Sequence, residues 1–218
     1  MVITETVEDY LKAIFELVTR TGEATTSSVA GRLAVAAPTA SAMLKRLAAD
    51  ELVARRRGRR VVLTAHGTRH ALSVVRRHRL IEAFLVKALD VPWEDVHAEA
   101  EVLEHAVSER LVERIDVFLG RPTHDPHGDP IPAPRGPHVE RWAMPLSQAP
   151  RGAAFQVERV RDRNRDALRE LGQLGVRPGV VLGVVEQAPF GGPLWVTVGD
   201  QRQALGSELA NLVFGVPA

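Results

Sequence analysis

The chain has 218 residues, of which 45% are hydrophobic and 25% charged, the composition of an ordinary globular protein with one large domain or a few small ones. It contains no cysteine, so disulfides, iron–sulfur clusters and thiolate zinc sites are excluded, and any metal must use oxygen and nitrogen ligands. The N-terminus shows no basic segment followed by an apolar run, and no run of about 18 apolar residues occurs. We therefore expect a cytoplasmic protein without a membrane segment.

The net charge is +1, but the positive charges are concentrated near the N-terminus. Residues 1–64 hold 10 Lys/Arg and 7 Asp/Glu, a net charge of +3, and half of those positive charges lie between Arg55 and Arg60. A basic tip on a small N-terminal unit indicates an anionic polymer as partner.

The first 64 residues have the pattern of three helices and a hairpin. Apolar periodicity predicts a helix from Thr4 or Thr6 to about Thr19 that ends at Gly22, a short helix from Thr25 or Thr26 through Leu33, and a helix from Pro38 to about Ala49. Two short strands around a basic, glycine-containing turn follow. This order predicts a winged helix-turn-helix, a double-stranded DNA-binding fold.

Small and polar residues on the third helix let its backbone approach a major groove, and the arginines of the wing suit the phosphate backbone or the minor groove. The candidate DNA contacts are Thr26, Ser27, Pro38, Thr39, Ser41, Ala42, Lys45, Arg46, Arg55, Arg56, Arg57, Arg59 and Arg60. The alternative is a solvated face with an arginine run that serves solubility. Helix order, Pro38 and a basic hairpin occurring together favour DNA.

Three further helices are expected: one from Thr64 to Leu89, one opened by Pro92 that carries His97 to His105, and one capped by Ser108 that ends at Phe118. They are too apolar to stand alone against one small domain. We therefore expect a homodimer through the helices of residues 74–118.

Metal-ligand residue types recur on these helices at helical spacing. His97, Glu101, Glu104 and His105 fall within about a third of a helix circumference. His78 and Glu82 lie four residues apart inside an apolar stripe, so they should be at least partly buried. Buried carboxylates cost several kcal/mol unless a cation or a donor compensates them. The pattern therefore predicts a cation site. His78 alone would be read as a core histidine with its hydrogen bonds satisfied, and Asp9 alone as a charge at a helix N-terminus.

The segment Gly120–Pro150 is rich in Pro and Gly and is not expected to be helical. Its histidines, His124, His127 and His138, are expected to be solvent-exposed rather than ligands, with metal binding as the alternative. After Ala153, three strand-like runs and a helix from Asn164 to Leu174 fit a small SH3-like barrel.

The predicted fold class is mainly α with small β. The expected domains are a winged helix-turn-helix (1–73), a helical dimerisation and metal-binding domain (74–140), a linker (141–152) and an SH3-like domain (153–218).

The combination resembles the iron- and manganese-dependent repressors typified by the diphtheria toxin repressor and the manganese transport regulator, over nearly the whole chain. The residues that carry the resemblance are V-E-D-Y-L (7–11), A-P-T-A-S (37–41), R-H-R-L-I-E (77–82), V-H-A-E-A-E-V-L-E-H (96–105) and D-P-H-G-D-P-I-P (125–132). The C-terminal L-G-Q-L-G-V-R-P-G looks like the SH3-like (FeoA-like) domain of longer members.

The resemblance implies the metal ligands Asp9, His78, Glu82, His97, Glu101, Glu104 and His105. Asp9 and Glu101 match the manganese-type members, where iron-type members have Met and Cys. Lys12 stands where manganese-type members offer a second carboxylate, and an ammonium group cannot bind a metal. The SH3-like positions that donate Glu and Gln in iron-type members correspond here to Arg159, which cannot serve, and Asp162, which can; Glu158 could with a register shift.

The implied function is a homodimeric transcriptional repressor of metal-uptake genes that binds palindromic operator DNA, with Mn²⁺ or Fe²⁺ as co-repressor and Zn²⁺, Co²⁺ or Cd²⁺ as surrogates. Four carboxylates beside three neutral imidazoles would be balanced by up to two divalent cations per subunit. The protein is expected not to be an enzyme. The alternatives are a metalloenzyme with a dinuclear carboxylate–histidine site, and a repressor that senses an organic ligand.

Overall fold

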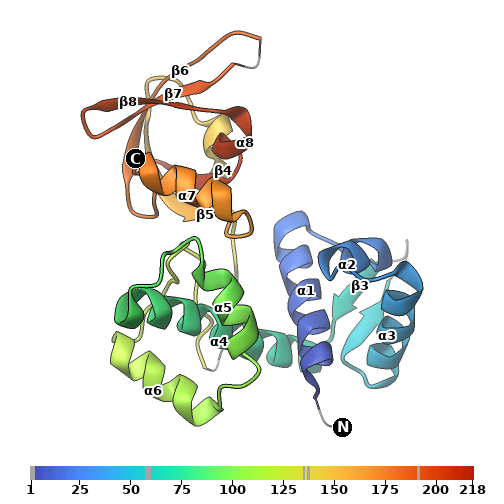
Figure 1. The fold of residues 1–218 in the computed structure, drawn as a ribbon. Coiled ribbons are helices and arrows are strands. Elements are labelled where there is room, and N and C mark those ends of the chain that lie inside the picture. The colour runs from blue at the N-terminus through green and yellow to red at the C-terminus, as the bar shows by residue number, and fades with distance from the viewer. Residues whose placement is uncertain (1–2, 57–59, 135, 137, 191) are drawn as a thin grey trace. The chain divides into compact units, whose positions relative to one another are not determined.

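The computed structural model describes residues 3–56, 60–134, 136, 138–190 and 192–218, and the chain forms two compact units (Figure 1). The first unit contains residues 1–78 and 132–141, and the second contains residues 79–131 and 142–218. The division falls inside the long helix α4 (Ala65–Leu89), whose residues up to His78 belong to the first unit.

The first unit is built around the predicted winged helix-turn-helix. Its helices are α1 (Glu5–Thr21), α2 (Thr26–Arg32) and α3 (Ala37–Ala49), and its strands are β1 (Ala24–Thr25), β2 (Val53–Arg55) and β3 (Arg60–Leu63). The strands form an antiparallel sheet in the order β1-β3-β2, whose first strand the sequence pattern does not predict because it is two residues long. Leu11, Ile14 and Leu44 are fully buried in the core that joins helices and sheet.

The ends of these helices follow local chemistry. Gly22 ends α1 in the left-handed conformation that glycine adopts without steric cost (φ 79°). The Thr25 hydroxyl accepts a hydrogen bond from the Ser28 amide at 3.1 Å, and the Ser28 hydroxyl accepts one from the Thr25 amide at 2.8 Å, which closes a reciprocal cap at α2. Thr4 occupies the N-cap position of α1, in agreement with the predicted start, although its side chain makes no cap hydrogen bond.

The second unit begins with the rest of α4, followed by α5 (Val96–Leu103) and α6 (Glu109–Leu119). The prediction that Pro92 opens the second of these helices is wrong, because residues 93–95 form a turn in which the Asp95 amide bonds to the Pro92 carbonyl. The helix also stops before Glu104 and His105, where the amides of Ala106 and Val107 both bond to the Leu103 carbonyl and turn the chain toward Ser108. Ser108 caps α6 as predicted, accepting from the Leu111 amide at 3.3 Å.

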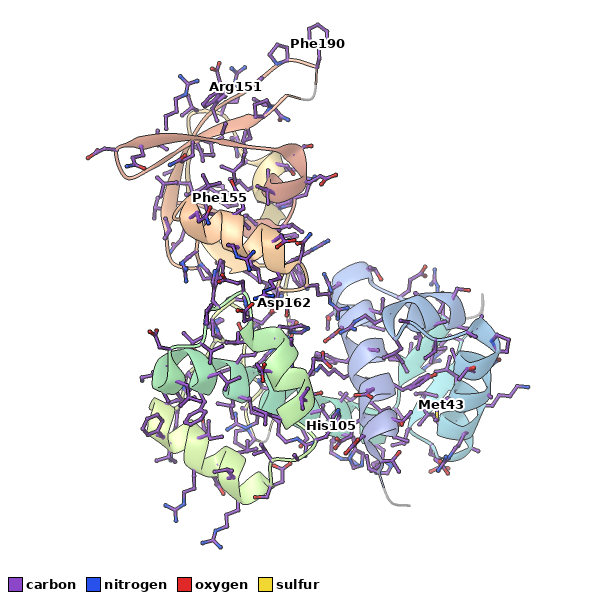
Figure 2. All side chains as sticks on the ribbon, in the orientation of Figure 1. Met43, His105, Arg151, Phe155, Asp162 and Phe190 are labelled. Atoms are coloured by element: carbon purple, nitrogen blue, oxygen red, sulfur yellow. The ribbon has the colours of Figure 1, made fainter. Side chains whose placement is uncertain are left out.

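A six-stranded antiparallel sheet with two short helices completes the second unit. Its strands β4 (Met144–Pro145), β5 (Ala154–Val160), β6 (Val181–Gln187), β7 (Leu194–Val198), β8 (Gln201–Leu205) and β9 (Val213–Pro217) lie in the order β4-β9-β5-β6-β7-β8. Helices α7 (Arg165–Gln173) and α8 (Ser207–Ala210) accompany them. Phe155 is fully buried in the core of this domain, among residues of β5, β6, β7 and α7 (Figure 2).

The SH3-like prediction is confirmed, with three strands more than the sequence pattern shows. The predicted helix is α7, capped by the Asn164 side chain, which accepts from the Ala167 amide at 3.0 Å. The segment 120–150, expected to be free of helix, contains β4 and one short 3₁₀ helix, Leu146–Gln148. Among the described residues, no helix combines the length and hydropathy needed to cross a membrane.

Candidate metal centre and DNA-binding surface

Two carboxylates of the second unit are fully buried, which is unusual for ionisable side chains. Glu82 lies on α4 and Glu104 directly follows α5, and each has no exposed surface. An isolated buried carboxylate would cost several kcal/mol, so the fold must provide compensating charge around both.

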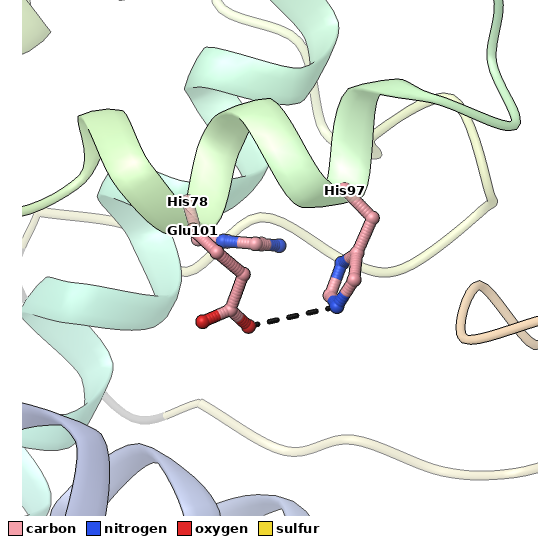
Figure 3. Close-up of side chains that lie close together, drawn as sticks. All are labelled: His78, His97 and Glu101. Carbon is pink, nitrogen blue, oxygen red and sulfur yellow. Dashed lines mark ion pairs between the residues drawn. The ribbon is translucent and has the colours of Figure 1, made fainter.

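Imidazoles lie beside both carboxylates. The His97 Nδ1 is 3.1 Å from the Glu82 Oε1, and the His97 Nε2 is 3.5 Å from the Glu101 Oε1 one turn along α5. Figure 3 shows this His97–Glu101 pair together with His78 of α4. The His105 Nε2 is 3.6 Å from the Glu104 Oε1. The helical spacing therefore pairs His97 with Glu101. The turn after Leu103 places Glu104 and His105 apart from that pair.

A carboxylate from the SH3-like domain joins the Glu82 group. Asp162 follows β5, and its Oδ2 lies 3.4 Å from the His97 Nδ1. Glu82, His127 and Asp162 each offer one ligand atom within 4.8 Å of the others, a spacing that a single metal ion can bridge. The donor set of carboxylate oxygens and imidazole nitrogens suits Mn²⁺, Fe²⁺, Co²⁺ or Zn²⁺.

The expectation that the histidines of segment 120–150 are exposed is wrong for His127, which is fully buried. His124 is exposed as expected. His138 is mostly buried and its Nε2 lies 3.2 Å from the Glu140 Oε1. The burial of His127 depends on how the loop packs against the barrel, which the sequence around His127 does not predict. The one signal in the sequence is the D-P-H-G-D-P block itself, which places a histidine between two turn-forming residues.

Beside this cluster, two arginines and two aspartates form a mostly buried network. Arg79 Nε is 3.8 Å from the Asp125 Oδ2, and Arg159 Nε is 3.1 Å from the Asp129 Oδ1. Burial and the negative charges of Asp129 and Glu82 raise the pKa of Asp125 well above its usual range, against the opposing effect of Arg79. Arg159, which cannot bind a metal, thus joins the barrel to the loop through an ion pair.

The loop also contacts the barrel through its backbone. The Val160 amide donates to the His127 carbonyl at 2.8 Å, and Gly128 follows at φ +87°. A Cβ on Gly128 would lie 2.0 Å from the carbonyl oxygen of Glu158 and 2.9 Å from the Cα of Arg159. Only glycine therefore allows this close approach of loop and strand.

We expect Gly128→Ala to destabilise the protein by about 2–4 kcal/mol, because backbone strain is added to a clash that β5 cannot relieve. Gly152→Ala is the matched control, since Gly152 also has a positive φ of 75° but no described atom lies within 4 Å of the position that its Cβ would take. The control should cost only about 1 kcal/mol. Urea unfolding of both variants measures the difference, and equal losses would mean that the close approach does not exist.

In the first unit, Lys12 and His78 are both buried, and the Lys12 Nζ lies 3.0 Å from the His78 Nδ1. The ammonium group of lysine has no hydrogen-bond acceptor, so Lys12 donates to the His78 Nδ1. This hydrogen bond occupies the lone pair of the His78 Nδ1. Asp9, also on α1, is partly buried. The chain thus places a cation on α1 where the resemblance leads one to expect a second carboxylate.

The predicted DNA contacts on α2 and α3 mostly lie at the surface. Ser27, Pro38, Thr39, Ala42, Lys45 and Arg46 are exposed, whereas Thr26 and Ser41 are partly buried. On the wing, Arg55, Arg56 and Arg60 are exposed, and the Arg60 Nε pairs with the Glu23 Oε2 at 2.6 Å. Arg57 and Arg59 lie outside the described residues. The basic side chains described on α3 and the wing are therefore accessible to solvent.

An apolar groove of ≈ 400 Å³ runs over α4, α5 and α6 of the second unit. Its lining includes several large side chains that stay exposed in the single chain, with Leu89, Leu111 and Phe118 each at least half exposed. The phenyl rings of Phe84 and Phe118 pack edge to face with centroids 5.9 Å apart. Exposed apolar patches of this kind are typical of interaction surfaces.

A winged helix-turn-helix, helices that carry buried carboxylates beside imidazoles, and an SH3-like barrel define the class of metal-responsive transcriptional regulators. Comparison with family models agrees for each part. Residues 2–61 match the iron dependent repressor N-terminal DNA binding domain, residues 64–133 match the iron dependent repressor metal binding and dimerisation domain, and residues 144–217 match the FeoA domain.

Known proteins are similar to this chain over nearly its whole length. The iron-dependent repressor IdeR of Mycobacterium leprae (strain TN) is 32% identical over 224 residues, which cover 97% of this chain and 96% of IdeR. A manganese-dependent transcriptional repressor solved in complex with manganese is 39% identical, with a TM-score of 0.89 over 97% of this chain and 99% of its own. ScaR solved with bound Cd²⁺ is 34% identical, with a TM-score of 0.81 over 97% and 99%. The chain belongs to the family of iron- and manganese-dependent transcriptional repressors.

Proposed function

We propose that this protein is a cytoplasmic, homodimeric repressor of metal-uptake genes that binds palindromic operator DNA when Mn²⁺ or Fe²⁺ is bound. The observation that carries the proposal is the pair of fully buried carboxylates, Glu82 and Glu104, each beside an imidazole, in a chain that also exposes basic side chains on α3 and the wing. Buried carboxylates must be compensated by charge or hydrogen-bond donors, and a divalent cation shared with the neighbouring imidazoles would compensate both. The proposal assigns no catalytic residue.

The proposed ligands divide into two groups. Asp9, Glu104 and His105 form a first set, and His78, Glu82, His97, Glu101 and Asp162 form a second. Asp9 belongs to the domain that reads DNA, while Glu104 and His105 belong to the helices of the proposed dimer. A metal bound by both would fix the spacing of two DNA readers so that they fit successive major grooves. A metal that prefers the DNA-competent state increases its population by its differential affinity.

The test is DNA binding by the chelator-treated protein to its own upstream promoter, with Mn²⁺, Fe²⁺ and Zn²⁺ titrated at fixed salt. We expect tight binding only with metal, and the order of effective concentrations ranks the metals. Zn²⁺, Co²⁺ and Cd²⁺ should act as surrogates because they accept the same ligands. Equal binding with and without metal would overturn the proposal and leave an organic effector as the next candidate.

Lys45 tests the proposed DNA face. Its side chain is exposed on α3, and loss of one phosphate contact should weaken DNA binding several-fold for all sequences. We expect Lys45→Ala to reduce the slope of log K against log salt by about 1 per subunit. Arg141→Ala removes an exposed positive charge outside the proposed face and should leave the slope unchanged. Fluorescence anisotropy at several salt concentrations measures both, and equal slopes for the two variants would contradict the proposed face.

A further inference from the structure

Two histidines near the start of α4, in the first unit, lie outside both proposed sets of metal ligands. His66 and His70 are four residues apart, so they project from the same face of the helix on successive turns. Their Nε2 atoms lie 3.0 Å apart and their ring centroids 4.8 Å apart, with an interplanar angle of 54°. His66 is exposed and His70 is partly buried, so a solute can reach both rings.

The helical turn that carries the pair is fixed to the segment before β2. The Thr64 hydroxyl accepts a hydrogen bond from the Gly67 amide at 3.0 Å and donates one to the Glu51 carbonyl at 2.6 Å. A Cβ on Gly67 would overlap the carbonyl oxygen of Leu52, so only glycine allows the helix to approach this closely. The two imidazoles are therefore attached to a preorganised backbone, which favours a binding site made by two side chains.

The distance between the two nitrogens suits a shared metal ion. Imidazole nitrogens bind divalent transition metals at about 2.0–2.1 Å, so two ligands at a right angle lie about 2.8–3.0 Å apart, and two at the tetrahedral angle about 3.3–3.4 Å. The 3.0 Å between the Nε2 atoms fits the right-angled geometry that Cu²⁺ and Ni²⁺ prefer. A hydrogen bond between the two rings would have the same length, and metal titration distinguishes the two.

Metal ions bind the neutral form of the imidazole ring. Burial and the positive charges of His66 and Arg69 lower the pKa of His70, against the opposing effect of Glu8. His70 is therefore neutral at physiological pH, and its Nε2 presents a lone pair whenever the Nδ1 carries the proton.

We propose that His66 and His70 form an accessory metal site that chelates Cu²⁺, Ni²⁺ or Zn²⁺ through their Nε2 atoms, with water completing the coordination. Two histidines four residues apart on one helix face are a ligand pair typical of zinc sites. Imidazole nitrogens suit Cu²⁺, Ni²⁺ and Zn²⁺, whereas Mn²⁺ prefers oxygen ligands and binds most weakly in its series. The accessory site therefore differs in metal preference from the proposed co-repressor sites, and it does not depend on the proposed function.

Calorimetric titration of the metal-free protein with Ni²⁺ and with Mn²⁺ tests the proposal. We expect His66→Gln to lose one Ni²⁺-binding event, or to weaken it by about 10-fold or more, because a single imidazole has no chelating partner. Mn²⁺ binding by this variant should equal that of wild type. His66→Gln/Arg69→His keeps two histidines but places them at adjacent positions, which do not face each other, so it should show the same loss.

His124→Gln is the control, since it removes an exposed histidine from the second unit, and it should bind both metals as wild type does. Wild-type stoichiometry and affinity for Ni²⁺ in His66→Gln would overturn the proposal and leave the pair as two hydrogen-bonded rings. Loss of Mn²⁺ binding in the same variant would also overturn it, because the substitution would then act on the co-repressor sites.

Chemical modification of the wild-type protein gives a second test that needs no variant. Diethyl pyrocarbonate modifies accessible imidazole nitrogens, and trypsin cleavage after Arg60, Arg69 and Arg76 puts His66 and His70 on separate peptides for mass spectrometry. We expect saturating Ni²⁺ to slow the modification of both residues several-fold, and Mn²⁺ to protect neither. Equal modification of His66 and His70 with and without Ni²⁺ would overturn the proposal.

Discussion

Glu104→Gln should make operator binding insensitive to metal at concentrations that saturate the wild-type protein. The Glu104 side chain has no exposed surface and lies 3.6 Å from His105, so the variant removes a charged ligand from the centre of the proposed first site. Loss of a direct ligand should weaken metal affinity by about 100-fold or more, since even the outer partners of metal ligands contribute about 10- to 100-fold. Anisotropy of labelled promoter DNA against free Mn²⁺ concentration measures the change.

In the absence of metal, the same substitution should not harm the protein and should leave its thermal stability unchanged or raised. A neutral amide of nearly equal shape replaces a buried carboxylate, so the metal-free Glu104→Gln should unfold at the same temperature as wild type or a higher one. Metal should then raise the unfolding temperature of wild type more than that of the variant, which keeps only the other proposed site, since a ligand present at about 100 times its Kd adds about 2.7 kcal/mol. A variant less stable than wild type without metal would show that Glu104 is a structural ion-pair partner and not a ligand.

Glu99→Gln is the matched control because Glu99 lies on the same helix α5 but is exposed. The charge change is identical, and only the burial differs. Metal-dependent DNA binding of this control should equal that of wild type. If both variants lose the response equally, the effect comes from the net charge of the helix rather than from a metal site.

The sequence predicts the first unit well because its elements are specified locally. Apolar residues at helical spacing, the Thr25–Ser28 cap and the glycine after α1 act within a few residues of one another, so a single sequence contains the information. The strands β8 and β9 escape prediction for the converse reason. β8 is largely exposed and polar, and β9 is defined by its pairing with β5, which lies more than 50 residues earlier in the chain.

In the candidate site, too, the features set by local sequence can be predicted and those set by distant contacts cannot. The spacing of His97 and Glu101 on one helix face is readable from the sequence, and both side chains do lie beside each other. The turn after Leu103 is not readable, and it gives Glu104 and His105 a different location from the one that a continued helix would give. The sequence also leads one to expect an exposed loop histidine at His127, because burial of a loop depends on the barrel packed against it. The positive φ of Gly128 that permits this packing is visible only in the fold.

Asp162 and Arg159 are two barrel residues that contact the side chains of the candidate site. The bulge between Val157 and Arg159 in the pairing of β5 with β9 shifts the strand register, so simple alternation does not place the residues that follow. Arg159 then pairs with Asp129, and Asp162 reaches His97. The guanidinium group of Arg159 and the proposed metal ion are thus expected to lie near each other, where the loop contacts the barrel.

Charged substitutions in the apolar groove should have the largest effect on DNA binding among the changes that leave the metal ligands intact. Leu111 and Phe118 both lie on α6, line the groove and are 50% and 62% exposed in the single chain. If a second copy covers them, a charge at each position must be desolvated without a partner, which costs several kcal/mol per subunit. We expect Leu111→Glu/Phe118→Glu to be monomeric in sedimentation equilibrium. Its affinity for a palindromic operator should fall at least 100-fold, because one DNA reader replaces two.

Phe190→Glu provides the control for this prediction, since Phe190 is a fully exposed phenylalanine between β6 and β7, away from the groove. It makes the same chemical change on the same domain unit and should leave both mass and operator affinity as they are in wild type. The double variant should retain metal binding in calorimetry, because the proposed ligands lie outside the substituted positions. A double variant that remains a dimer would place the subunit interface on another surface, and a monomer that still binds the operator at wild-type affinity would show that recognition requires only one reader.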